Sequence, residues 1–187
     1  MTPIRFDAAR CDVLNLNALA DGMPGITPRV GAYLAEAAVA CLEQERHGPD
    51  IGMRVDGEFE HRIRLQWSDF GDPEQRARAW GDGDVATEQG AYGIAALLVS
   101  GLTDYTVVER ARKGPGFDYW LGRRDGDGLL FQDKARLEVS GVRRGDDQVI
   151  ASRIRRKMKQ IEPSDTDLPG VVAVVEFGAP RTRVKTK

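Results

Sequence analysis

The feature that most constrains the fold is an apolar run near the end of the chain, Val171 to Phe177, in which Glu176 is the single charged residue. Such runs are typical of strands covered on both faces, because a half-exposed strand alternates apolar with polar side chains. In α/β folds helices cover both faces of the sheet. The run therefore suits an interior strand of an α/β fold.

Helical periodicity predicts three long helices. Apolar residues recur every three or four positions in residues 29–46, 85–101 and 147–161, so each segment can bury one face. In the second segment the predicted stripe runs through Glu88 and Ala91, which places an acid on the core-facing side near the start of the helix. An acid at that end also complements the helix dipole, so a structural role is an alternative.

The third predicted helix carries a polar edge in a basic part of the chain. Arg153, Lys157 and Gln160 are spaced i, i+4 and i+7, so they share one edge and can point at a common target. From Arg143 to Lys187, eleven lysines and arginines stand against six acids. This end could face nucleic-acid phosphates, although a solvated helix face explains the same bias.

Alternation of apolar and polar residues predicts a β-hairpin over residues 51–67, with a tight turn at Asp56 and Gly57. The acidic, glycine-containing stretch that follows predicts a boundary near position 83. We therefore expect two regions: a layer formed by a helix and a β-hairpin, residues 1–83, packed on a core formed by residues 84–187.

Two segments of the second region are predicted to be neighbouring strands, each with one carboxylate among apolar residues. Alternation places Asp118 and Trp120 on one face of the first strand, and Arg136, Glu138 and Ser140 on one face of the next. Two acids on neighbouring strands can converge. A buried carboxylate is costly unless it is paired, hydrogen-bonded or bound to a metal, so these positions need an explanation.

Two explanations for these acids stay open from the residues alone. In the first, Asp118 and Glu138 bind a divalent cation, because Mg²⁺ takes oxygen ligands from one or two carboxylates together with water and substrate phosphate. In the second, the acids form structural salt bridges with Arg136, Arg123 or Arg124.

Composition excludes several classes of protein. The chain is 41% apolar and 30% charged, as is typical of soluble globular proteins. No apolar run approaches the roughly 20 residues of a membrane span, and the first ten residues lack the apolar core of a signal peptide. We therefore expect a cytoplasmic protein with no membrane partner. Cys11 and Cys41 are too few for a disulfide framework and, with two histidines, too sparse for a zinc cluster.

From about residue 84 to 178 the predicted order is helix, three strands, helix, strand. With Glu88 on the first helix, Gly116-x-Asp118 on the second strand and Glu138-x-Ser140 on the third, the pattern resembles the PD-(D/E)XK nuclease superfamily. This resemblance implies an α/β fold with a restriction-endonuclease-like αβββαβ core, in which helices flank a central mixed sheet. The N-terminal helix and β-hairpin would form an extension of that core.

The resemblance also implies a function. The chain would be a metal-dependent nuclease that hydrolyses phosphodiester bonds of DNA or RNA, with DNA the expected partner. Asp118 and Glu138 would bind Mg²⁺ or Mn²⁺, the carbonyl of Val139 would add a ligand, and Glu88 would be an auxiliary acid. The superfamily further suggests a role in bacterial defence against foreign DNA.

The pattern departs from the superfamily at Ser140, where a lysine is expected. Lys157 is the candidate that could supply the missing charge from the following helix, and Gln160 could position a water or a phosphate. The residues expected to bind the nucleic-acid backbone without reading its sequence are all basic. They are Arg143, Arg144, Arg153, Arg155, Arg156 and Lys159.

The departure at Ser140 leaves a second function open. The same fold without catalysis would serve as a nucleic-acid-binding or scaffold subunit, with residues 1–83 forming a surface for a homodimer or a partner protein. A third alternative is an α/β protein whose acids only pair with its arginines. Divalent-metal binding separates the nuclease from both alternatives.

Overall fold

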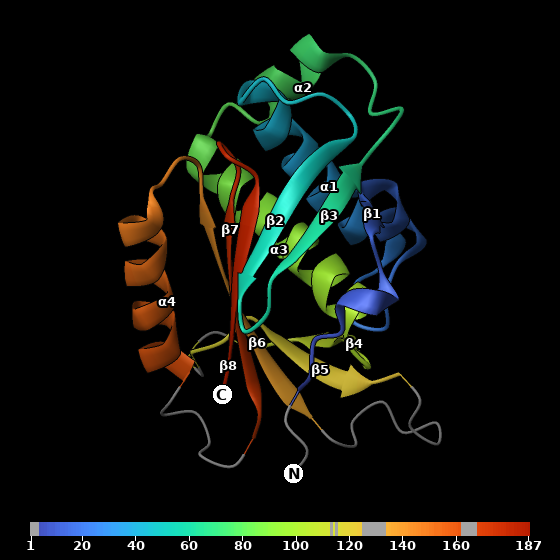
Figure 1. The fold of residues 1–187 in the computed structure, drawn as a ribbon. Helices are drawn as coiled ribbons and strands as arrows, with labels where there is room; N and C mark the ends of the chain where they lie inside the picture. The colour runs from blue at the N-terminus through green and yellow to red at the C-terminus, as the bar shows by residue number, and fades with distance from the viewer. Residues whose placement is uncertain (1–3, 113, 115, 125–133, 162–167) are drawn as a thin grey trace.

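The computed structural model describes residues 4–112, 114, 116–124, 134–161 and 168–187 (Figure 1). The helices are α1 (Pro28–Gln44), α2 (Pro73–Ala79), α3 (Gly83–Leu102) and α4 (Asp147–Ile161). The strands are β1 (Val13–Asn15), β2 (Ile51–Gly57), β3 (His61–Gln66), β4 (Tyr105–Arg110), β5 (Tyr119–Arg123), β6 (Ala135–Val142), β7 (Gly170–Glu176) and β8 (Arg181–Thr186). The three predicted helices correspond to α1, α3 and α4, and the predicted hairpin corresponds to β2 and β3.

The described part of the chain forms one mixed sheet of eight strands in the order β1-β3-β2-β8-β7-β6-β5-β4. Three pairs are parallel, namely β1 with β3, β2 with β8, and β6 with β7. The remaining neighbours are antiparallel. The predicted α/β class is confirmed. Along the chain, residues 83–176 follow the order α3, β4, β5, β6, α4, β7.

Strand β7 lies inside this sheet and is buried along its whole length. Val171, Ala173 and Val175 belong to the core that includes α1 and α3, whereas Val172 and Val174 pack with the isoleucines of α4. An alternation of this kind gives each face of the strand its own apolar partner. The prediction that the apolar run forms an interior strand covered on both faces is therefore confirmed.

Helices cover both faces of the sheet (Figure 1). The pair α1 and α3 packs together on one face, and α4 lies over β6, β7 and β8 on the other. A side chain at Gly90 of α3 would place its Cβ 2.9 Å from the Cα atom of Ala38, so the two helices touch backbone to backbone. Among the described helices, none is both long and apolar enough to cross a lipid bilayer.

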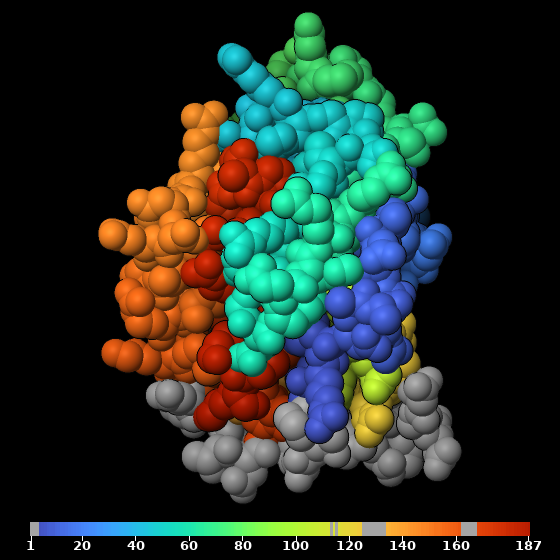
Figure 2. All heavy atoms as spheres, viewed as in Figure 1, coloured from blue at the N-terminus to red at the C-terminus, as the bar shows by residue number. Residues whose placement is uncertain are grey.

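The hairpin of β2 and β3 joins the sheet edge to edge, through β8. Strand β8 pairs with β7 on one side and with β2 on the other. The space-filling view shows β8, in red, beside the cyan hairpin on one face of the molecule (Figure 2). Strands from both predicted regions, 1–83 and 84–187, therefore share one sheet, and the division between the regions stays a prediction.

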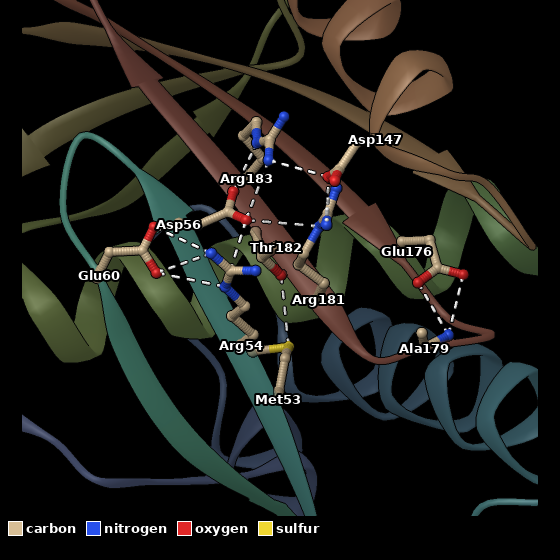
Figure 3. Close-up of polar contacts among 10 residues, drawn as sticks. All are labelled: Met53, Arg54, Asp56, Glu60, Asp147, Glu176, Ala179, Arg181, Thr182 and Arg183. Carbon is tan, nitrogen blue, oxygen red and sulfur yellow. Dashed lines mark hydrogen bonds and ion pairs between the residues drawn. The ribbon is translucent and has the colours of Figure 1, made fainter.

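A network of charged side chains ties β2 to β8 (Figure 3). Asp56 is 1% exposed and accepts a hydrogen bond of 2.6 Å from Nε of Arg183. Its Oδ2 also lies 3.6 Å from Nε of Arg54 and 3.6 Å from Nε of Arg181. The prediction of a tight turn at Asp56 and Gly57 is wrong, because β2 continues through both residues and buries this carboxylate against the arginines of β8.

Candidate active site

Strand β6 presents its polar residues to α4. Leu137 and Val139 are buried in the core on the α3 side. On the other face, Glu138 pairs with Lys157, and Nη1 of Arg153 lies 3.5 Å from Oγ of Ser140. The predicted alternation along this strand is confirmed, and it directs the carboxylate of Glu138 toward a helix that carries basic residues.

Asp118 lies in a bend immediately before β5 and is fixed by the strands on either side. Its backbone N–H donates to the carbonyl of Leu137, and its carbonyl accepts from Ala111, both at 2.9 Å. Oδ2 of its carboxylate accepts a hydrogen bond of 2.8 Å from the backbone N–H of Val139. Because this N–H belongs to the residue after Glu138, the bond brings the two acids together.

The predicted alternation around Asp118 is wrong. Trp120 packs edge-on against Phe117, with ring centroids 4.6 Å apart, in the cluster on the α4 side. Oδ1 of Asp118 instead accepts a hydrogen bond of 2.9 Å from the hydroxyl of Tyr92 on α3. Side chains alternate between faces only in an extended strand. Asp118 lies in a bend, and β5 begins one residue later, so the alternation does not extend back to Asp118.

Gly116 allows the segment before Asp118 to lie against the last turn of α4. Its φ is +80°, and a Cβ atom there would stand 2.3 Å from the carbonyl oxygen of Gln160. Only glycine combines this backbone conformation with such a close approach. The contact holds the bend that carries Asp118 close to the helix that carries Lys157.

Glu88 and Asp118 are linked through Tyr92. The tyrosine hydroxyl lies 2.9 Å from Oε1 of Glu88 and 2.9 Å from Oδ1 of Asp118. Burial, and then the negative charge of Asp118, raise the pKa of Tyr92 above its usual value, so the hydroxyl keeps its proton. Glu88 itself is exposed. The prediction that it starts on the core-facing side is wrong, because the acid lies at the rim of the site.

Lys157 supplies positive charge at the acids. Its ammonium group forms an ion pair with Oε1 of Glu138, whose side chain is only 5% exposed. Burial and the nearby carboxylate of Asp118 raise the pKa of Glu138 to about 7, while Lys157 opposes that shift. Arg153, Lys157 and Gln160 share the helix edge that the sequence predicted, since the first two contact β6 and Gln160 lines the same cavity as Lys157.

Two adjoining cavities open around the acids. One has a volume of about 560 Å³ and is lined by all the predicted catalytic residues, namely Glu88, Asp118, Glu138, Lys157 and Gln160. The second, of about 480 Å³, shares Glu88, Asp118 and Lys157 with the first. Arg153 and Arg156 line the second cavity, whereas Arg110 and Arg112 line the first. Basic side chains therefore stand on both sides of the acidic pair.

The remaining predicted backbone-binding residues lie elsewhere. Arg155 and Lys159 are exposed on α4 and line neither cavity. Arg143 donates to the side chain of Gln44, and both Arg143 and Arg144 form ion pairs with Glu45, beyond the end of α1. The sequence suggested one basic surface, but the loop after β6 directs these two arginines to the acid near α1.

The arginines proposed as structural partners of the acids bind other groups. Arg123 lies 3.7 Å from Asp104, and Arg124 donates to the carbonyl of Thr103 at 2.7 Å. Arg136 is fully buried and donates to the carbonyl of Ile161, at the end of α4, and to that of Leu168, shortly before β7. These contacts hold strands and helix ends in place. The salt bridge observed at Glu138 is formed by Lys157.

Within the described ranges no three His, Cys, Asp or Glu side chains form a metal-ligand cluster. The carboxylates of Asp118 and Glu138 are oxygen donors of the kind that a divalent cation such as Mg²⁺ or Mn²⁺ takes. Because the N–H and C=O of one strand residue point to the same side, the carbonyl of Val139 points, like its N–H, toward Asp118. Mg²⁺ typically takes one or two carboxylates and fills its other positions with water and phosphate.

Two residues near the acids were missed from the sequence. Tyr92 follows Glu88 by one helical turn, and that spacing could have indicated it. Arg110 ends β4, and no local pattern pointed to it. Comparison with known protein families, with characterised proteins and with solved structures gives no match for this chain.

Proposed function

We propose that this protein is a metal-dependent nuclease of the PD-(D/E)XK type, which hydrolyses phosphodiester bonds in DNA or RNA. The observation that carries the proposal is the convergence of Asp118 and Glu138, from separate segments, beside the ammonium group of Lys157. A buried carboxylate beside a second, half-buried carboxylate has a high electrostatic cost, and the raised pKa of Glu138 expresses that cost. Divalent-metal binding would relieve it.

The order of elements supports the proposal. Helix α3, strands β4 to β6, helix α4 and strand β7 follow the αβββαβ order of the superfamily, with Glu88 on the first helix. Glu138 stands on β6, and Asp118 stands in the bend just before β5, close to the strand positions that the superfamily pattern expects, with the departure at Ser140. Lys157 approaches Glu138 from α4, as expected of a cation that replaces a missing strand lysine.

Asp118, Glu138 and the carbonyl of Val139 would hold the metal ion. When bound there, Mg²⁺ supplies positive charge that polarises a phosphodiester and lowers the pKa of a bound water. Lys157 donates hydrogen bonds to phosphate oxygens as negative charge develops on them. Tyr92 fixes the orientation of Asp118 through their hydrogen bond. In the overall reaction, water adds to phosphorus and the P–O bond breaks, leaving a phosphate on one product and a hydroxyl on the other.

The test combines metal binding with cleavage. Calorimetric titration with Mg²⁺ and Mn²⁺ compares the wild-type protein with Glu138→Ala and Asp118→Ala, and labelled single- and double-stranded DNA and RNA serve as substrates. We expect both variants to fold, to lose metal binding and to lose cleavage. Glu74→Gln is the matched control, because this acid is exposed on α2 and pairs only loosely with Arg78, at 3.7 Å. Cleavage that persists in both active-site variants contradicts the mechanism.

A second function is favoured by Ser140 and by the engagement of Lys157 with Glu138. A lysine held by an acid contributes less to a phosphate, which favours a nucleic-acid-binding subunit without catalysis. Salt-sensitive nucleic-acid binding that needs no metal, with no cleavage of any substrate, would select this function over the nuclease.

A further inference from the structure

Arg110 lies at the site and has no role in either the sequence pattern or the proposed chemistry. It is the last residue of β4, and it lines the cavity that holds Glu88, Asp118, Glu138 and Lys157. Its surroundings show how the fold positions the guanidinium group, and what that group can bind.

Two tyrosines hold the guanidinium group of Arg110. Its Cζ atom lies 4.5 Å from the ring centroid of Tyr92 and 4.7 Å from that of Tyr119, and the two rings meet edge to face. Nη1 donates a hydrogen bond of 2.7 Å to the hydroxyl of Tyr119. A guanidinium has five N–H donors in a rigid fork, so these contacts fix its plane and leave other donors for a ligand.

A bulge in β4 selects Arg110 for this position. Val107 lies opposite Leu121, but the next pairs are Glu109 with Trp120 and Arg110 with Tyr119, so the register shifts by one residue. Residues directly opposite each other share a face of the sheet. Arg110 therefore joins Tyr119 on the face that points toward α3.

Without the bulge, the regular pairing would put Glu109 opposite Tyr119. A further carboxylate would then stand beside Glu88 and Asp118, and Arg110 would point to the other face. Bulges recur beside active sites, where they re-aim a side chain. In this strand the bulge replaces an acid with a cation at the cavity.

The segment before α1 supports the bulge from outside the sheet. The N–H of Gly25 donates to the carbonyl of Val107 at 3.0 Å. A Cβ atom at Gly25 would lie 2.5 Å from the carbonyl carbon of Val108 and 2.5 Å from the nitrogen of Glu109. The register shift is thus built into the packing of β4, which is an edge strand of the sheet.

We propose that Arg110 binds a backbone phosphate of the polynucleotide substrate, on the side of the acidic pair opposite Arg153 and Arg156. The proposal rests on the proposed nuclease function and adds to it a residue and a substrate requirement. Arg153 and Arg156 line the other cavity, and Lys157 lines both. With cations on each side of Asp118, the site can contact backbone phosphates on both sides of the bond that is cleaved. The substrate would then be an internal phosphodiester, from which the chain continues in both directions.

The test measures binding apart from cleavage. Wild-type protein in EDTA, which removes divalent metal, is titrated into labelled single-stranded and duplex oligonucleotides over a range of salt concentrations. Arg110→Met should weaken binding about tenfold and reduce the salt slope by about one, because one phosphate contact is lost. Arg110→Lys should recover part of the affinity, and Tyr119→Phe, which removes only the hydroxyl, should show an intermediate loss.

Arg78→Met is the matched control, because it removes one positive charge from an exposed side chain on α2. Equal losses in Arg78→Met and Arg110→Met, or no loss in either, would overturn the assignment of Arg110 while the nuclease proposal stands. Wild-type protein that neither binds nor cleaves any nucleic acid would overturn both proposals. Thermal unfolding of each variant verifies that the affinities compare folded proteins.

Discussion

The ammonium group of Lys157 on α4 pairs with the carboxylate of Glu138 on β6, nineteen residues earlier in the chain. The contact joins a helix on one face of the sheet to an acid that sits beside Asp118. It places a cation at the acids, although the residue two positions after Glu138 on β6 is Ser140 and not a lysine.

Replacing Lys157 with methionine should lower the single-turnover cleavage rate about a hundredfold or more, because a hydrogen-bond donor to the developing charge is lost. Lys157→Arg should retain part of the rate. Lys185→Met, a change on β8 that breaks the pair with Glu58, is the control and should cleave normally. Wild-type rates in Lys157→Met would mean that Lys157 only neutralises Glu138.

The stability of the metal-free protein should fall as the pH rises toward 8. The pKa of Glu138 is raised from 4.5 to about 7 in the folded protein, chiefly by burial. Its contribution is therefore fully present below about pH 4.5 and is lost as the pH rises through about 7. Relative to Glu138→Gln, the wild type should lose about 2 kcal/mol of unfolding free energy between about pH 5 and pH 8, measured by urea denaturation. Parallel pH profiles for the two proteins would refute this linkage.

Removing the hydroxyl of Tyr92 should weaken metal binding without unfolding the protein. Tyr92→Phe keeps the ring under Arg110 but breaks the 2.9 Å hydrogen bonds to Glu88 and Asp118. Groups that orient metal ligands typically contribute about tenfold to a hundredfold in affinity. Calorimetry with Mn²⁺ should show a loss in this range, and Tyr33→Phe, an exposed tyrosine on α1, should show none. Unchanged affinity in Tyr92→Phe would mean that Asp118 is oriented by Val139 alone.

Asp56→Ala should destabilise the protein by about 3–5 kcal/mol, because it leaves the surrounding arginines without their buried counter-charge. Glu60→Gln is the matched control, because Glu60 pairs with Arg54, as Asp56 does, but is exposed. It removes an acid that contacts Arg54 at 3.1 Å but is 68% exposed, so the cost should stay below about 1 kcal/mol. Equal effects in chemical denaturation would show that burial of Asp56 does not set its contribution.

Local patterns predicted the parts of the molecule that depend on local geometry. The period of the apolar residues gave α1, α3 and α4, and the uniform run gave β7, because each of these elements buries faces defined by its own sequence. The same reasoning placed Glu138 and Ser140 on one face of β6. It also placed Arg153 and Lys157 on one edge of α4, since side-chain directions within an element are fixed by its backbone.

The failures concern interactions that no local pattern encodes. The pairing of β2 with β8 joins residues far apart in the chain. Because of this pairing, Asp56 lies in a buried network of charged side chains and not in the predicted turn. Arg110 was not identified from the sequence, because the bulge that turns it toward α3 is set by the pairing of β4 with β5 and not by a local pattern. Arg143 and Arg144 were assigned to nucleic acid from charge alone, but Glu45 lies within reach of both.

Strand β8 lies between β2, the first strand of the hairpin, and β7, the strand that follows α4. During synthesis, β2 and β7 therefore emerge from the ribosome before the segment that joins them exists. Until residues 181–186 have been synthesised, β2 and β7 lack the strand that pairs with both of them, and an unpaired strand edge is a template for association with other chains. The two parts of the sheet can therefore be joined only after the last strand has been made. Arg181 and Arg183 of that segment bind Asp56 of β2 and so stabilise the pairing of the two strands.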